Sequence, residues 1–301
     1  ARSGAAWAVD PPPVPVRGQA THAMRPAGIF LTHQRSPRIR RHFQRLVRES
    51  GHLVTWHLVF NPDTGARPRA PFAYDDPAQV LAGRYRAMVR NGGVLGGYLD
   101  TLLIPVIRAL PADHLWVIEY DVDYAGRWDD LFGQFADNDS DLLTTTLRYR
   151  PEQPRWPHWQ TARAPSWVPE DRWVRSLNPL MRVSRRLLNT YAVAMADDDW
   201  QGHYEFTLAT SALVSGARVE DLGGAGSFTP PDRVARNYIG TVPDDQDEEL
   251  TFAFRPVRPR YFHEAPDAFP RAGMIYHPVK PGVRAWTEQN KNQPPPAKRP
   301  R

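Results

Sequence analysis

Short apolar runs alternate along the first half of the chain with stretches whose apolar residues recur at helical spacing. The runs are rich in β-branched and aromatic residues, which is typical of strands, and they cover 27–33, 52–60, 114–124 and 141–148. One helical stretch begins at Ser36-Pro37, and further helical stretches cover 77–90, 96–110 and 127–135. This alternation predicts an α/β fold with a mostly parallel central sheet that is flanked by helices on both faces.

The pattern changes in the second half of the chain. Residues 150–180 form a long connection that is rich in proline and holds four tryptophans, Trp156, Trp159, Trp167 and Trp173. We expect helices at 183–196 and 203–216, a short strand after 217, and a loop-rich remainder with β-like pieces at 250–254 and 273–280. Aperiodic, proline-rich composition indicates flexible tails at 1–25 and 286–301, which leaves a single domain over 26–285.

The stretch "LWVIEYDVDY" runs from an apolar strand directly into a cluster of carboxylates. If the strand continued through 114–124, Glu119, Asp121 and Asp123 would share one face, and that face would change from apolar to acidic within two steps. Clustered carboxylates repel one another unless a cation or hydrogen-bond donors share the site. A divalent ion, Mg²⁺ or Mn²⁺, with phosphate oxygens completing its shell, is the natural occupant at the carboxyl end of a parallel strand. A solvent-exposed edge strand is the alternative interpretation.

Composition narrows the function classes. The chain has 301 residues, 41% hydrophobic and 24% charged, without cysteine, so disulfides and thiolate metal sites are excluded. Its net charge of +5 does not indicate a nucleic-acid partner, because residues 287–301 hold four basic residues and one acidic residue and so contribute +3. No apolar run reaches the about 18 residues of a membrane span, and no signal peptide is visible. We expect a cytoplasmic protein without a transmembrane segment, with peripheral membrane association left open.

The acidic strand end resembles that of the GT-A glycosyltransferases. More narrowly, "WVIEYDVDYAGRWDDLF" resembles a poorly characterised glycosyltransferase-like group with a Trp-x-x-Glu-x-Asp-Val…Gly-x-Trp signature. The resemblance implies a GT-A fold with a nucleotide-sugar half at 26–150 and an acceptor half at 151–285. It also implies that Asp121 meets the nucleotide-sugar and Asp123 meets the metal, while Glu119 is structural.

The resemblance extends to residues near both ends of the domain. It implies nucleotide or ribose contacts for Thr32, at the end of the first predicted strand, and for Asp100. The late stretch "MIYHPVKPG" implies a metal ligand at His277 and a diphosphate contact at Lys280. A surface His-Pro turn is the alternative for this stretch.

A further acidic candidate is Glu205 in "GHYEF", where a general base for an inverting sugar transfer would stand if the resemblance holds. A carboxylate favoured by the dipole of a helix start is the alternative interpretation. Tryptophans can stack on sugar rings or anchor a long loop, so Trp200 and Trp159 are either acceptor contacts or core. His203 is a further candidate acceptor contact.

These residues together predict a glycosyltransferase that moves a sugar from a nucleotide-diphosphate donor to a hydroxyl of a glycan or another acceptor, assisted by Mn²⁺ or Mg²⁺. Two other classes remain open. One is a metal-dependent hydrolase of phosphate esters or sugars, and the other is a non-catalytic carbohydrate-binding module.

Overall fold

The computed structural model describes residues 25–60, 97–240, 250–253 and 269–279. In this part of the chain six strands form one sheet in the order β2-β1-β3-β6-β5-β7. All neighbours run parallel except β6, which is antiparallel to both β3 and β5. The bounds are β1 Ala27–Thr32, β2 Thr55–Phe60, β3 His114–Glu119, β5 Leu142–Tyr149, β6 Val174–Ser184 and β7 Val219–Asp221. The predicted α/β class with a mostly parallel sheet is confirmed.

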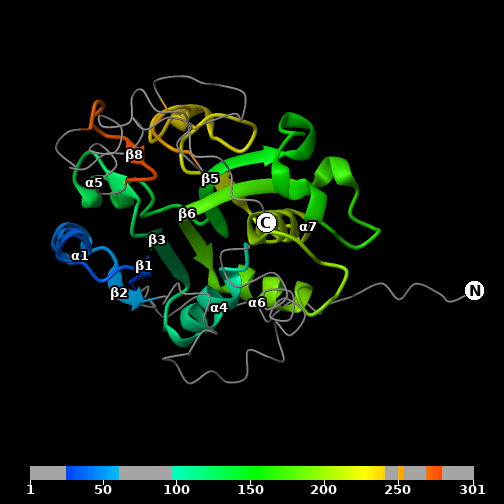
Figure 1. Cartoon of the computed structure of the whole chain (residues 1–301), viewed down its shortest axis with the longest axis horizontal. Coiled ribbons are helices and arrows are strands. Elements are labelled where there is room, and N and C mark those ends of the chain that lie inside the picture. Colours follow the sequence, from blue (N-terminus) through cyan, green and yellow to red (C-terminus); the bar gives the residue numbers. More distant parts are fainter. Residues whose placement is uncertain (1–24, 61–96, 241–249, 254–268, 280–301) are drawn as a thin grey trace, which may run out of the picture.

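Helices cover both faces of this sheet, as the sequence predicts (Figure 1). One face packs against α1 (Pro37–Ser50) and α5 (Trp128–Gly133), and the other packs against α4 (Asp100–Ala109), α6 (Arg185–Ala194) and α7 (Tyr204–Val214). Successive side chains of β3 point to opposite faces of the sheet. Trp116 and Ile118 pack in the core on the α1 and α5 side, and Val117 packs in the core on the side of α4, α6 and α7. A strand that is buried on both faces explains why "LWVI" is continuously apolar.

Local signals in the sequence set where two helices begin. The Oγ of Ser36 accepts the backbone N–H of Ile39, and Pro37 occupies the first turn of α1, as predicted. The Oγ of Ser184 accepts the N–H of Leu187 in the same way and starts α6 directly at the end of β6.

The predicted strand at 114–124 is wrong in its second half. β3 ends at Glu119, where the N–H of Tyr120 donates to Leu31 O at the end of β1. The N–H of Val122 then donates back to Glu119 O and closes a turn. Residues Asp123–Tyr124 form a separate strand, β4, which pairs antiparallel with β8 (Ile275–Tyr276). The three carboxylates therefore do not share one strand face.

The connection predicted at 150–180 contains short 3₁₀ helices, η2 Arg150–Glu152, η3 Pro157–Thr161 and η4 Glu170–Arg172, and then the first part of β6. The sequence pattern did not predict this strand, which is buried along its whole length. Its first residues lie beyond the end of β3, since Ile118 pairs with Leu180, and beside the end of β5, since Tyr149 pairs with Val174. β6 thus brings polar side chains to the edge where the parallel strands end.

Other predicted elements have mixed outcomes. The helix at 77–90 and the flexible tails lie outside the described residues, apart from Arg25. The β-like piece at 250–254 is described up to residue 253, and there Phe252 makes isolated bridges to Gly240 and His277. A further 3₁₀ helix, η5 Pro231–Arg233, lies in the loop-rich part after 225.

Candidate metal centre and its surroundings

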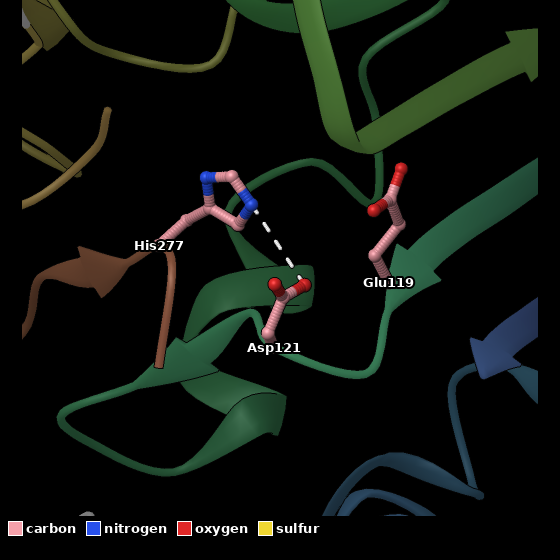
Figure 2. A group of neighbouring side chains, drawn as sticks. All are labelled: Glu119, Asp121 and His277. Carbon is pink, nitrogen blue, oxygen red and sulfur yellow. Dashed lines mark ion pairs between the residues drawn. The ribbon is translucent and has the colours of Figure 1, made fainter. Parts of the chain in front are cut away.

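Three segments bring Glu119, Asp121 and His277 together at the carboxyl edge of the sheet (Figure 2). Glu119 ends β3, Asp121 lies in the turn that follows, and His277 comes directly after β8. Each residue offers one ligand atom, and these atoms all lie within 4.8 Å of one another. The Nε2 of His277 is 3.7 Å from Oδ1 of Asp121. Asp121 and His277 are buried, and Glu119 is half-buried.

Hydrogen bonds fix the orientation of the His277 ring. Its Nδ1 lies 2.6 Å from the carbonyl oxygen of Ala253, an atom that can only accept, so Nδ1 carries a proton. In the neutral ring the lone pair is then on Nε2, the atom that faces Asp121. Metal-binding histidines are commonly held in this way, by a backbone carbonyl on the nitrogen that does not bind the ion.

Backbone hydrogen bonds hold the two chain segments against each other. The N–H of Val279 donates to Asp121 O over 2.7 Å, and the N–H of His277 donates to Thr251 O over 2.9 Å. The Val279–Asp121 bond and the pairing of β4 with β8 join the two segments that carry the buried ligands, and the bond to Thr251 anchors the backbone of His277, so the relative position of the ligands does not depend on side-chain contacts alone.

The donor set fits a divalent cation. Two ligands on opposite sides of a hard ion, each about 2.1 Å from it, are about 4.2 Å apart, so small side-chain movements suffice to close the 4.8 Å spread of this group. Carboxylate oxygens suit Mg²⁺ and Mn²⁺, while an imidazole ligand is better matched to transition metals. Among the described residues this group could hold a metal ion, which agrees with the predicted cofactor class.

Asp123, the predicted metal ligand, lies outside this group. Its Oδ1 accepts Nη1 of Arg45 at 2.8 Å and the N–H of Tyr124 at 2.7 Å. The physical reason is the early end of β3, because the turn at 120–122 directs Asp121 and Asp123 to different neighbours. In the structure Glu119 and Asp121 join His277 in the group that could hold a metal ion, while Asp123 pairs with Arg45. A contact of Asp123 with the metal, and of Asp121 with the nucleotide-sugar, stays a prediction.

Glu205 lies in the first turn of α7, as the helix-start interpretation predicted, and is buried. Its Oε1 accepts the backbone N–H of Asn178 on β6 at 3.4 Å, and its Oε2 lies 3.4 Å from Nδ1 of His203. Burial raises the pKa of Glu205 to about 7, against the opposing influence of the Arg175 guanidinium and the Asn178 N–H. The pKa of this carboxyl group therefore lies near neutral pH.

Predicted acceptor contact His203 has a structural role in the same turn. Its Nδ1 accepts the N–H of Glu205 at 3.3 Å and so caps α7. Its ring packs on that of His158 with the centroids 4.3 Å apart. A contact with an acceptor remains a prediction for His203.

Tyr204 is buried directly before Glu205 in the first turn of α7. Burial raises its pKa well above 10, and the negative charges of Glu119, Glu205 and Asp100 raise it further. The phenol therefore stays protonated. Asp100, a predicted donor contact, accepts the hydroxyl of Tyr191 at 2.6 Å from within the first turn of α4. Its contact with a nucleotide stays a prediction.

The sequence analysis did not identify two further residues around Glu205. Arg175 is buried on β6, and loss of solvation lowers its pKa to about 10. Tyr204 stands inside the quoted motif "GHYEF", so its position was available as a signal. Nothing in the sequence around Arg175 indicates a buried charge, because the strand that carries it was not predicted.

Thr32 lies at the predicted place, at the end of β1, on the same edge of the sheet. Its Oγ1 accepts the N–H of Gln34 at 3.0 Å and closes the turn that leads to α1. A nucleotide contact at Thr32 stays a prediction. Lys280, the predicted diphosphate contact, lies outside the described residues.

The predicted acceptor tryptophans are core residues. Trp159 is 7% exposed, donates Nε1–H to Gln153 O at 2.9 Å, and packs edge-on against Phe206. Trp200 is 5% exposed and packs against the same ring. Both side chains anchor the 150–173 segment and the approach to α7, so the anchoring interpretation holds for them. Trp167, in contrast, is 65% exposed.

Comparison with known proteins does not place the chain in a family. No protein-family model matches the sequence, and a search of curated proteins finds no match. Within the described ranges, none of the helices has both the length and the apolar character needed to cross a bilayer.

Proposed function

We propose that this protein is a metal-assisted glycosyltransferase of GT-A type, which moves a sugar from a nucleotide-diphosphate donor to an acceptor hydroxyl. The observation that carries the proposal is the group Glu119, Asp121 and His277 at the carboxyl edge of the sheet. In open α/β sheets this edge is where ligands bind. The mostly parallel sheet with one reversed strand, β6, is compatible with the GT-A type.

The metal group has the chemistry that a diphosphate donor needs. A divalent ion held by Glu119, Asp121 and His277 would offset the charge that develops on the leaving diphosphate. The carbonyl of Ala253 keeps the His277 lone pair directed at the group, and the N–H of Val279 fixes the backbone of Asp121. Glu119 is the least buried of the three residues.

Glu205 has the properties of a general base. At a pKa of about 7 it accepts a proton readily and is still sufficiently ionised at neutral pH. Its ionised form is stabilised by Arg175 and by the N–H of Asn178, both from β6. Tyr204, the residue before Glu205, keeps its phenol proton at neutral pH and can therefore donate a hydrogen bond. In the proposed reaction Glu205 takes the proton of the acceptor hydroxyl as that oxygen attacks the anomeric carbon.

A metal-dependent hydrolase is the second candidate. It is favoured by the burial of Trp159 and Trp200, because neither ring is available as a stacking surface for an acceptor sugar. The same carboxylates would then serve a reaction in which water replaces the acceptor.

Turnover of the donor separates the two candidates. Release of nucleoside diphosphate is measured from a panel of nucleotide-sugars with Mn²⁺, in the presence and absence of a mixture of glycan acceptors. A transferase releases it faster when acceptors are present, and Asp121→Asn abolishes the release while Asp232→Asn, at an exposed position in η5, leaves it unchanged. Equal release without acceptor indicates the hydrolase. Turnover that survives in Asp121→Asn contradicts both.

A further inference from the structure

Arg45 of helix α1 binds the chain segment 123–126, which follows Glu119 and Asp121 of the metal group. The guanidinium donates Nη1 to Asp123 Oδ1 at 2.8 Å and Nη2 to the carbonyl oxygens of Tyr124 and Gly126 at 3.0 and 2.5 Å. Its Nε donates to Glu49 Oε1 at 3.1 Å, one turn further along the helix. All three nitrogens are thus engaged, and one side chain ties three positions of the 123–126 segment to α1.

Two other side chains of α1, those of His42 and Glu49, bind the same part of the chain on either side of the Arg45 contacts. The ring of His42, three residues before Arg45, lies with Nε2 2.9 Å from Val122 O. Burial lowers the pKa of His42, so the ring is neutral and donates its Nε2–H to that carbonyl. Glu49 accepts the N–H of Trp128 at 3.1 Å where α5 begins. Helix α1 therefore binds successive points of the backbone from Val122 to Trp128.

The same segment determines where two of the three metal-group residues lie. Asp123 pairs with Tyr276 in the β4–β8 ladder. Asp121 precedes Asp123 by two residues, and His277 follows Tyr276 directly. Asp123 is therefore connected to Asp121 along the chain and to His277 through the β4–β8 ladder, and we expect a displacement of Asp123 to disturb both. Glu119 is fixed independently, because β3 is held between β1 and β6 up to its end.

We infer that Arg45 is a positioning residue that sets the affinity of the Glu119, Asp121 and His277 group for a divalent cation. The inference rests on the proposed function, since it concerns the same metal group. Arginine suits this role because its donors are spread over three nitrogens of a planar fork that reach a carboxylate and two carbonyls in fixed directions, whereas the donors of a lysine sit on a single nitrogen. Partners that orient metal ligands typically change metal affinity by about 10- to 100-fold when removed.

The test compares Arg45→Gln and Arg45→Lys with Arg48→Gln, a matched change at an exposed arginine of the same helix. Mn²⁺ binding to the full chain is measured by titration calorimetry, and amide hydrogen exchange of the metal-free protein is followed in peptides covering 119–126 and 274–279. In Arg45→Gln we expect a Kd for Mn²⁺ raised about 10- to 100-fold and faster exchange in both peptides. Arg45→Lys should recover part of the affinity, because lysine can keep the ion pair with Asp123, and Arg48→Gln should match the wild type.

Two results separate this inference from the proposed function. If the wild type binds Mn²⁺ and a folded Arg45→Gln binds it equally well with unchanged exchange, the positioning role is wrong and the metal group stands. If the wild type binds no Mn²⁺, the metal group itself is wrong, and the inference falls with it. Should Arg45→Gln not fold, His42→Gln removes the imidazole contacts with Val122 O and Asp123 and keeps a polar side chain of similar length. A several-fold loss of Mn²⁺ affinity in a folded His42→Gln supports the role of α1, and wild-type affinity overturns it.

Discussion

The raised pKa of Glu205 predicts how one substitution changes stability with pH. The folded protein holds the proton of Glu205 up to about pH 7, whereas the unfolded chain releases it near the ordinary value of 4.5. The free energy of unfolding therefore falls as pH rises between these two values, and the buried carboxylate is destabilising above them. Glu205→Gln mimics the protonated side chain and removes this dependence.

The size of the effect follows from the same two pKa values. A difference between 4.5 and about 7 corresponds to about 3 kcal/mol once pH exceeds both, and to less than about 1 kcal/mol at pH 5. The side chain is fully enclosed, so solvent screening does not reduce this figure substantially. Glu205→Gln should therefore be more stable than the wild type by about 3 kcal/mol at pH 8 and nearly equal to it below pH 5.

Urea unfolding of both proteins at intervals between pH 5 and pH 8 measures this difference. Glu170→Gln is the control, because the side chain of Glu170 is 66% exposed and should show little dependence of this kind. The substitution should also abolish turnover, since glutamine cannot accept the proton. A stability difference that is constant with pH, or that shows a less stable variant at pH 8, would refute the assigned ionisation.

Three further predictions concern the surroundings of the site. His277→Ala should raise the Kd for Mn²⁺ at least about tenfold in calorimetry while the protein stays folded, and unchanged affinity would remove His277 from the metal group. Trp159→Ala should lower the free energy of unfolding by about 3–5 kcal/mol in urea titrations; a fully stable variant with a raised KM for acceptor would restore its role as an acceptor contact. Gly97→Ala should be destabilising by at least about 2 kcal/mol, because Gly97 has φ +89° and a Cβ there would lie 2.1 Å from the His203 ring; wild-type stability would show that the backbone can move aside.

The sequence predicted most strands and helices because each has a clear local pattern. The exception, β6, shows why pattern is sometimes insufficient. Pro179 and the polar Arg175, Asn178 and Arg182 interrupt any alternation, and proline is unusual inside a central strand. The strand is nevertheless buried, because its polar groups find partners far away in sequence: Arg182 donates to the carbonyls of Phe135 and Asn138.

The candidate site was identified in part for a similar reason. Sequence reasoning selected Asp121, His277 and Glu205, which have chemically suitable side chains in recognisable motifs. It assigned the metal to Asp123 and the nucleotide-sugar to Asp121, whereas the structure groups Glu119 and Asp121 with His277, because the grouping depends on the residue at which β3 ends. That end is set by hydrogen bonds to β1 and by pairing of β4 with β8, some 150 residues further along the chain, which no local pattern encodes.

The most direct test of the central claim is a thermal-shift panel of nucleotide-sugars, measured with and without Mn²⁺ on the wild type and on Asp121→Asn. A ligand that binds only the folded state raises Tm with its concentration. A metal-assisted glycosyltransferase should be stabilised by one nucleotide series, and Mn²⁺ should enhance this stabilisation in the wild type and not in Asp121→Asn. Absence of any shift across the panel, or a shift that is the same without Mn²⁺ and in Asp121→Asn, would contradict a metal-assisted glycosyltransferase centred on this group.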